Sequence, residues 1–101
     1  MKKLCAIIFK SKSENEEYSD LICEKLGTSN LSPNQEFCGI WGEIISNREE
    51  CLDAISRTVN YFLKSDKSEI YFGCCEKDYN DIIARIDTGL CEVNILSCTA
   101  V

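Results

Sequence analysis

Histidine is absent from this 101-residue chain, and proline, tryptophan and methionine occur once each. Without histidine, the chain lacks the usual general base of cysteine and serine nucleophiles and the commonest nitrogen ligand of zinc. Long apolar runs are also missing. The amino-terminal run covers only residues 4–9, whereas a signal peptide needs an apolar core of about 7–15 residues and a membrane span needs about 18. We therefore expect a cytoplasmic protein.

Basic side chains are few. The chain has 11 Lys and Arg against 17 Asp and Glu, a formal net charge of −6 at pH 7 and a pI near 4.6. Nucleic acids and anionic membranes are bound through clustered basic residues, so neither is an expected partner. The excess of negative charge favours a partner that is itself basic, because complementary electrostatic fields speed encounter and fix orientation.

The eight cysteines follow none of the spacings that define a redox or zinc motif. The sequence contains no Cys-x-x-Cys and no paired cysteine knuckles. Most cysteines lie among apolar neighbours, where a free thiol packs as a small hydrophobic group. We expect reduced and largely buried thiols, with no metal and no cofactor.

Cys74 and Cys75 are the one pair of cysteines that invites a catalytic interpretation, because they end a predicted strand just before a helix, whose N-terminus can lower a thiol pKa. The acids Glu76, Asp78 and Asp81 oppose a thiolate at this place, and no histidine is available as its base. Successive strand residues point to opposite faces, so we expect one thiol to be buried and the other to be more accessible. We interpret the pair as structural and the chain as a protein that is not an enzyme.

A single α/β domain over residues 1–101 is predicted, because apolar strand segments alternate with amphipathic helical ones. Capping-box spacing marks two helix starts, Ser13 with Glu16 and Asn47 with Glu50. The predicted fold is an α/β sandwich in β-α-β-α-β-α-β order, with a four-stranded sheet, parallel or mixed, and three helices. Strands are predicted over residues 3–9, 36–46, 69–75 and 91–98, and helices over 13–26, 47–65 and 77–89, with Gly27 and Gly89 ending the first and last helix.

Acidic side chains gather at the start of all three predicted helices. Helix dipoles favour acids at these positions, and charge runs are commonly no more than solvated faces. A second interpretation is that neighbouring helices combine their acids into one negative surface that binds a partner, with lysine and arginine concentrated elsewhere. On this second interpretation, the predicted partner-binding residues are Glu14, Glu16, Glu17, Glu49, Glu50, Asp53, Asp78 and Asp81, with Trp41 as an aromatic anchor.

These features together predict a small acidic cytoplasmic binding protein that neutralises a basic protein, and we favour an immunity protein that inhibits a nuclease toxin. Inhibition would require no chemistry, since acidic side chains would occupy the positive groove that normally receives phosphate. A phage-type inhibitor of another nucleic-acid enzyme would use the same physics. A third hypothesis is a ligand-binding regulatory α/β domain that works as a dimer through a sheet edge.

Overall fold

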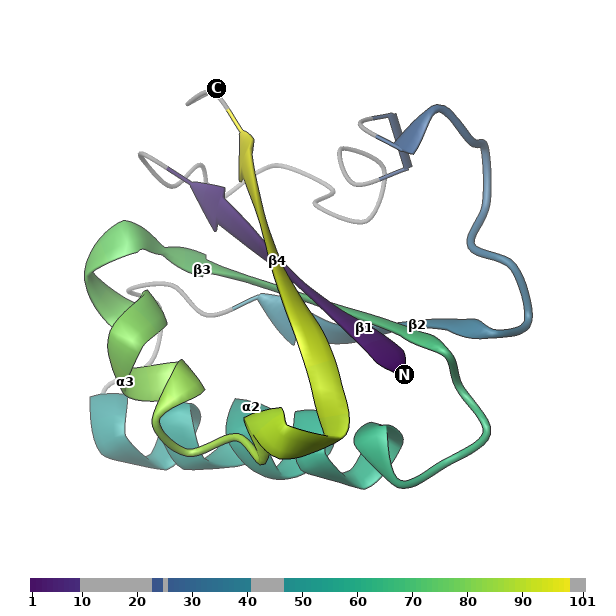
Figure 1. The fold of residues 1–101 in the computed structure, drawn as a ribbon. Coiled ribbons are helices and arrows are strands. Elements are labelled where there is room, and N and C mark those ends of the chain that lie inside the picture. The colour runs from purple at the N-terminus through teal and green to yellow at the C-terminus, as the bar shows by residue number, and fades with distance from the viewer. Residues whose placement is uncertain (10–22, 25, 41–46, 99–101) are drawn as a thin grey trace.

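The computed structural model describes residues 1–9, 23–24, 26–40 and 47–98. These residues form one sheet with helices packed against it (Figure 1). Four parallel strands stand in the order β2-β3-β1-β4, so the described sheet is parallel rather than mixed. The predicted four-stranded α/β fold is thereby confirmed. The strands are β1 (Lys2–Phe9), β2 (Gln35–Ile40), β3 (Glu69–Cys75) and β4 (Cys91–Cys98).

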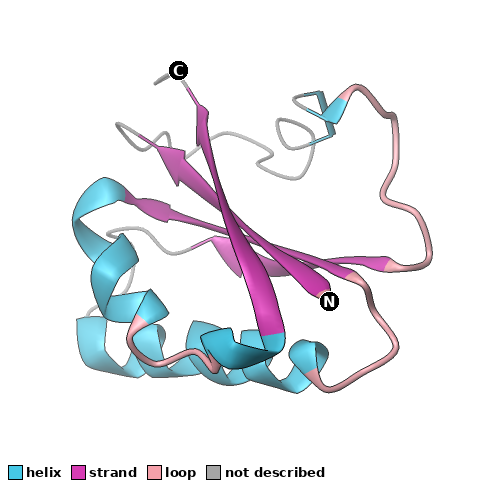
Figure 2. Ribbon diagram, viewed as in Figure 1, coloured by secondary structure: helices cyan, strands magenta, loops and turns pink. Residues whose placement is uncertain are grey.

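Two α-helices, α2 (Arg48–Leu63) and α3 (Tyr79–Ile83), lie on one face of this sheet (Figure 2). Two short 3-10 segments, η1 (Glu76–Asp78) and η2 (Thr88–Leu90), flank α3. Two α-helices lie wholly within the described residues, against the three predicted, and residues 23, 24 and 26 are also helical. Most of the helix predicted over residues 13–26 lies outside the described residues.

The end predicted for that first helix is present at Gly27. Gly27 has a φ of 72°, the left-handed conformation that glycine adopts without steric cost. Its N–H donates to the Glu24 carbonyl over 3.1 Å, and the Thr28 N–H donates to the Cys23 carbonyl over 3.0 Å. These two bonds form the Schellman motif that commonly closes a helix.

Helix α2 forms where the capping and periodicity signals predicted it. The side chain of Asn47 accepts a hydrogen bond from the Glu50 N–H over 3.3 Å, which satisfies one of the free amides at the helix start. The predicted apolar stripe is buried at four of its five positions, and the fifth, Phe62, is half-buried. The four buried side chains are Leu52, Ile55, Val59 and Leu63.

Helix α3 is shorter than predicted, and the side chain of Asn60 on α2 explains where it ends. Asn60 donates to the Arg85 carbonyl over 3.0 Å and accepts from the Asp87 N–H over 2.9 Å. These tertiary bonds satisfy backbone groups that a continuing helix would have paired internally. Ile82 and Ile86 are still buried as predicted, while Ile83 is only half-buried.

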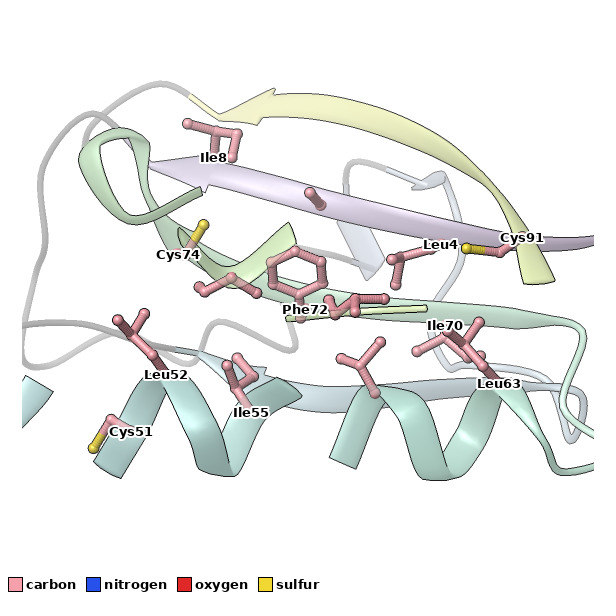
Figure 3. Close-up of a cluster of buried hydrophobic side chains, with 14 residues drawn as sticks. Leu4, Ile8, Cys51, Leu52, Ile55, Leu63, Ile70, Phe72, Cys74 and Cys91 are labelled. Carbon is pink, nitrogen blue, oxygen red and sulfur yellow. The ribbon is translucent and has the colours of Figure 1, made fainter. Parts of the chain in front are cut away.

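The main core lies between the sheet and α2 (Figure 3), where side chains from β1, β3 and both helices meet. Phe72, Leu4 and Leu52 are fully buried there. The opposite face of the sheet carries a smaller buried cluster of Cys5, Ile7 and Tyr71. The two inner strands, β1 and β3, thus bury side chains on both faces, as the near-continuous apolar sequence of residues 3–9 predicted for β1.

In the described ranges, no helix has the combination of length and apolar character that a membrane crossing requires.

Candidate functional site

The α2–α3 surface, defined here by the carboxylates of Glu49, Glu50, Asp53 and Asp81, contains the exposed members of the predicted acidic set that the structure describes. Glu49, Glu50 and Asp53 belong to the first turns of α2, and Asp81 belongs to α3. The two helices pack side by side, so acids far apart in sequence meet at one surface.

Arg48 connects the two helices at one end of this surface. Its Nε and Nη2 atoms each lie 2.9 Å from Oδ1 of Asp78, and Nη2 also contacts the carboxylate of Asp81. The hydrogen bond from Arg48 lowers the pKa of Asp81. Asp81 therefore stays ionised at neutral pH and is held in place by the guanidinium group.

Asp78 is buried, with 3% of its surface exposed, so it cannot contact a partner directly as the sequence had suggested. Its carboxylate is turned toward Arg48. A buried carboxylate is stable only when it is paired and hydrogen-bonded. We therefore describe Asp78 as the group that positions Arg48, which in turn positions Asp81.

Arg85, two residues after the end of α3, makes a second connection to α2. Its Nη2 atom lies 2.6 Å from Oε2 of Glu49, and its Nε atom lies 3.2 Å from Oδ1 of Asp53. Glu49 and Asp53 nevertheless remain mostly exposed, with side chains 67% and 60% accessible. Arg85 thus holds two carboxylates of α2 at fixed positions without covering them.

The expectation that arginine would lie away from the acids is wrong for Arg48 and Arg85. The α2–α3 surface with Asp78 brings together five carboxylates and two guanidinium groups, so its excess charge is smaller than the helix sequences alone indicate. The remaining predicted residues, Glu14, Glu16, Glu17 and Trp41, lie outside the described residues.

Seven cysteines take part in no disulfide, in line with the prediction of reduced thiols: Cys5, Cys23, Cys38, Cys51, Cys74, Cys75 and Cys91. Cys74 is fully buried while Cys75 is half-exposed, which confirms the predicted alternation. Burial, followed by the charge of Asp78, raises the pKa of Cys74 to about 12, and burial likewise raises that of Cys38 to about 12. Both thiols are therefore protonated at neutral pH and unsuited to act as nucleophiles.

A groove of about 520 Å³ lies on the sheet face opposite the helices. Polar side chains at the start of all four strands form a row across it: Gln35 pairs in register with Glu69, Glu69 with Lys3, and Lys3 with Glu92. Within this row, Glu69 accepts hydrogen bonds from Tyr71 over 2.6 Å and from Gln35 over 2.7 Å. These bonds lower the pKa of Glu69.

The sequence carried a local signal for the place of the two arginines and of the row of polar side chains, but none for the partners that they contact. Arg85 follows Asp81 by four positions, the spacing at which helical side chains meet, and Arg48 stands directly after the cap residue Asn47. Lys3 and Glu69 lie at the start of strands whose next same-face residues, Cys5 and Tyr71, are buried. Strands that start at one edge of a parallel sheet bring such first residues together.

In the ranges that the structure describes, no group of three or more histidine, cysteine or acidic side chains is arranged to hold a metal ion. No family model, curated protein or solved structure matches this chain. Geometry and charge are therefore the basis for a functional proposal.

Proposed function

We propose that this chain is a small cytoplasmic binding protein that neutralises a basic protein through its α2–α3 surface, and that it acts as an immunity protein against a nuclease toxin. The observation that carries the proposal is the fixed arrangement of exposed carboxylates around Arg48 and Arg85. The net charge of −6 supports it, because such a chain attracts positively charged proteins over long range.

The carboxylates on this surface have capacity left for a partner. An ionised carboxylate has about four acceptor positions, and the contacts to Arg48 and Arg85 use only part of that capacity at Asp81, Glu49 and Asp53. Lysine or arginine side chains of a partner can therefore bind the open positions while the internal pairs stay in place. Preorganised acceptors lose less conformational entropy on binding than free side chains do.

This arrangement accounts for inhibition without catalysis. A nuclease binds its substrate through a positive groove, and carboxylates spaced along two packed helices would take the place of the phosphates in such a groove. A phage-type inhibitor of another nucleic-acid enzyme would use the same surface in the same way. The identity of the captured partner separates these two functions.

Affinity capture from the native host, followed by mass spectrometry, tests the proposal. The bait is compared with a variant that carries Glu49→Gln, Glu50→Gln and Asp53→Asn together. A matched control carries Glu24→Gln, Asp66→Asn and Glu92→Gln, three exposed acids elsewhere. We expect a basic nucleic-acid enzyme on the wild type and the control, and its loss on the first variant.

Equal capture by both triple variants, with folding confirmed by circular dichroism, would contradict the proposed surface. Capture of acidic or neutral proteins alone would contradict the proposed class of partner. Both triple variants should stay folded, even though the first removes the ion pairs of Arg85 with Glu49 and Asp53, because exposed charges contribute little to stability.

A second candidate function, a ligand-binding regulatory domain, is favoured by the groove on the other face of the sheet. Its volume of about 520 Å³ falls in the range of small-molecule sites, and Lys3 and Glu92 offer opposite charges. A small polar molecule with both charges would suit it. Thermal-shift screening with such molecules tests this function, and Lys3→Met should abolish any stabilisation that a hit produces.

A further inference from the structure

Strand β4 forms one edge of the described sheet. All eight of its residues stand in unbroken register with β1, from Lys2 opposite Cys91 to Phe9 opposite Cys98. Within the described residues, β1 is the only strand that pairs with β4. The N–H and C=O groups on the outer side of an edge strand are a template for another strand.

The opposite edge, β2, carries the features that normally prevent such pairing. It has six residues, and its register with β3 shifts between Phe37 and Ile40. Oε2 of Glu36, the second residue of β2, lies 3.6 Å from Nζ of Lys67. Irregular register, short length and charge all block the addition of a strand at a sheet edge. The edge strand β2 is therefore less able than β4 to pair with a strand of another chain.

Strand β4 lacks these protective features. Its sequence contains no proline, no lysine and one charged residue, Glu92 near its start. Ile95 pairs in register with Ala6, whose side chain is in the main core, yet 57% of Ile95 is exposed. Val93, two residues earlier on the same face, is half-buried. An exposed apolar side chain on an unprotected edge marks a surface that another chain covers.

We propose that β4 pairs antiparallel with β4 of a second copy of this chain, joining the two sheets into one of eight strands. Two-fold symmetry makes such a contact self-complementary and closed. Antiparallel pairing also places the two Glu92 side chains at opposite ends of the contact, so they do not repel each other. The Val93 and Ile95 side chains of both copies then form one apolar row.

A second copy suits this edge better than the basic partner proposed above. One charged side chain in eight residues gives a basic protein little electrostatic attraction, whereas two copies of a strand with so little charge do not repel each other. The α2–α3 surface contains no residue of β4, so dimer formation and partner binding use different residues. This inference does not depend on the proposed function.

The expected dimer is weak. A single pair of eight-residue strands buries less surface than the roughly 1,200 Å² of a stable interface. We therefore expect a dissociation constant on the order of 10–100 µM. Light scattering during size exclusion, from about 1 to about 500 µM, should show the mass rise from 11.4 kDa toward twice that value. Ile95→Lys should weaken dimerisation by about tenfold or more, because edge lysines oppose strand pairing.

Tyr61→Lys is the matched control, since Tyr61 is 70% exposed on α2. It should dimerise like the wild type. Hydrogen exchange on the wild type supplies a second measurement that needs no variant: amides of β4, and not those of β2, should exchange more slowly at high concentration. A mass of 11.4 kDa at every concentration would overturn the proposal. So would a dimer that leaves the exchange of β4 amides unchanged.

Discussion

The Nε atom of Arg48 lies 2.9 Å from Oδ1 of Asp78, thirty positions later in the chain, and this contact joins the start of α2 to the segment that follows β3. The Arg48 side chain is 45% exposed while that of Asp78 is 4% exposed. The pair is thus anchored from inside the protein and presents its guanidinium group outward. Asp81 is bound to the same guanidinium group, so its position depends on a residue that a partner never touches.

Asp78→Asn should destabilise the fold more than Asp81→Asn does. The first change weakens a buried, charge-assisted contact and should cost about 1–3 kcal/mol. The second removes an exposed ion pair and should cost less than about 1 kcal/mol. Urea unfolding monitored by circular dichroism measures both losses of stability. The free energy of unfolding should fall with urea concentration at the same slope in both variants. An equal, small loss in both variants would show that Asp78 does not anchor Arg48.

The thiols should be present but slow to react in the folded protein. Unfolding without reductant should expose all eight. In the native state at pH 8, Cys38 and Cys74 should react about a thousandfold more slowly than a thiol of ordinary pKa, because their pKa values of about 12 leave little thiolate. Mass spectrometry after timed alkylation identifies the modified positions. Rapid native labelling of Cys74 would contradict its burial.

Tyr71→Phe should change the pH dependence of stability on both sides of neutrality. The lowered pKa of Glu69 contributes stability above its ordinary value of 4.5 that is lost as pH falls through the folded-state pKa. The pKa of Tyr71 is raised, by burial first and then by Glu69, so its contribution is present below its ordinary pKa of 10.0 and is lost above it. Removing the Tyr71 hydroxyl should therefore make the free energy of unfolding depend less on pH in both the acid and the alkaline range.

Urea unfolding between pH 2 and pH 11 tests this expectation. Tyr61→Phe, at an exposed tyrosine, is the matched control and should reproduce the wild-type profile. The acid limb should not vanish entirely in Tyr71→Phe, since the pKa of Asp81 is also lowered, by Arg48. A Tyr71→Phe profile identical to that of the wild type would mean that the Tyr71 hydrogen bond to Glu69 does not form in solution.

Local signals were sufficient to predict most elements of the fold. The apolar run at β3 ends before the charged residues Glu76 and Lys77, and the run at β4 begins shortly after Gly89. The predicted bounds of both strands match the structure. Helix α2 was predicted because Asn47 supplies a cap and its apolar residues recur at helical spacing. Strand order was not predicted, because it depends on which buried faces fit together rather than on any single segment.

The arrangement of charges needed the tertiary structure. Acids at helix starts have a sufficient local cause in the helix dipole, so the sequence alone gave no reason to pair Glu49 with Arg85 across 36 positions. The early end of α3 likewise depends on Asn60, a residue of another helix. The row from Gln35 to Glu92 requires the register of four strands to be known.

The association rate with the captured basic partner, measured at low and at physiological salt, tests the central claim most directly. Charges of opposite sign attract over about 30 Å at 0.01 M salt and about 8 Å at 0.15 M. The wild type should therefore associate much more slowly at the higher salt, while dissociation changes less. The variant with Glu49→Gln, Glu50→Gln and Asp53→Asn should associate slowly at both, and the control with Glu24→Gln, Asp66→Asn and Glu92→Gln should follow the wild type more closely. Association rates that respond equally to salt in all three proteins would contradict a role of the α2–α3 surface in partner binding.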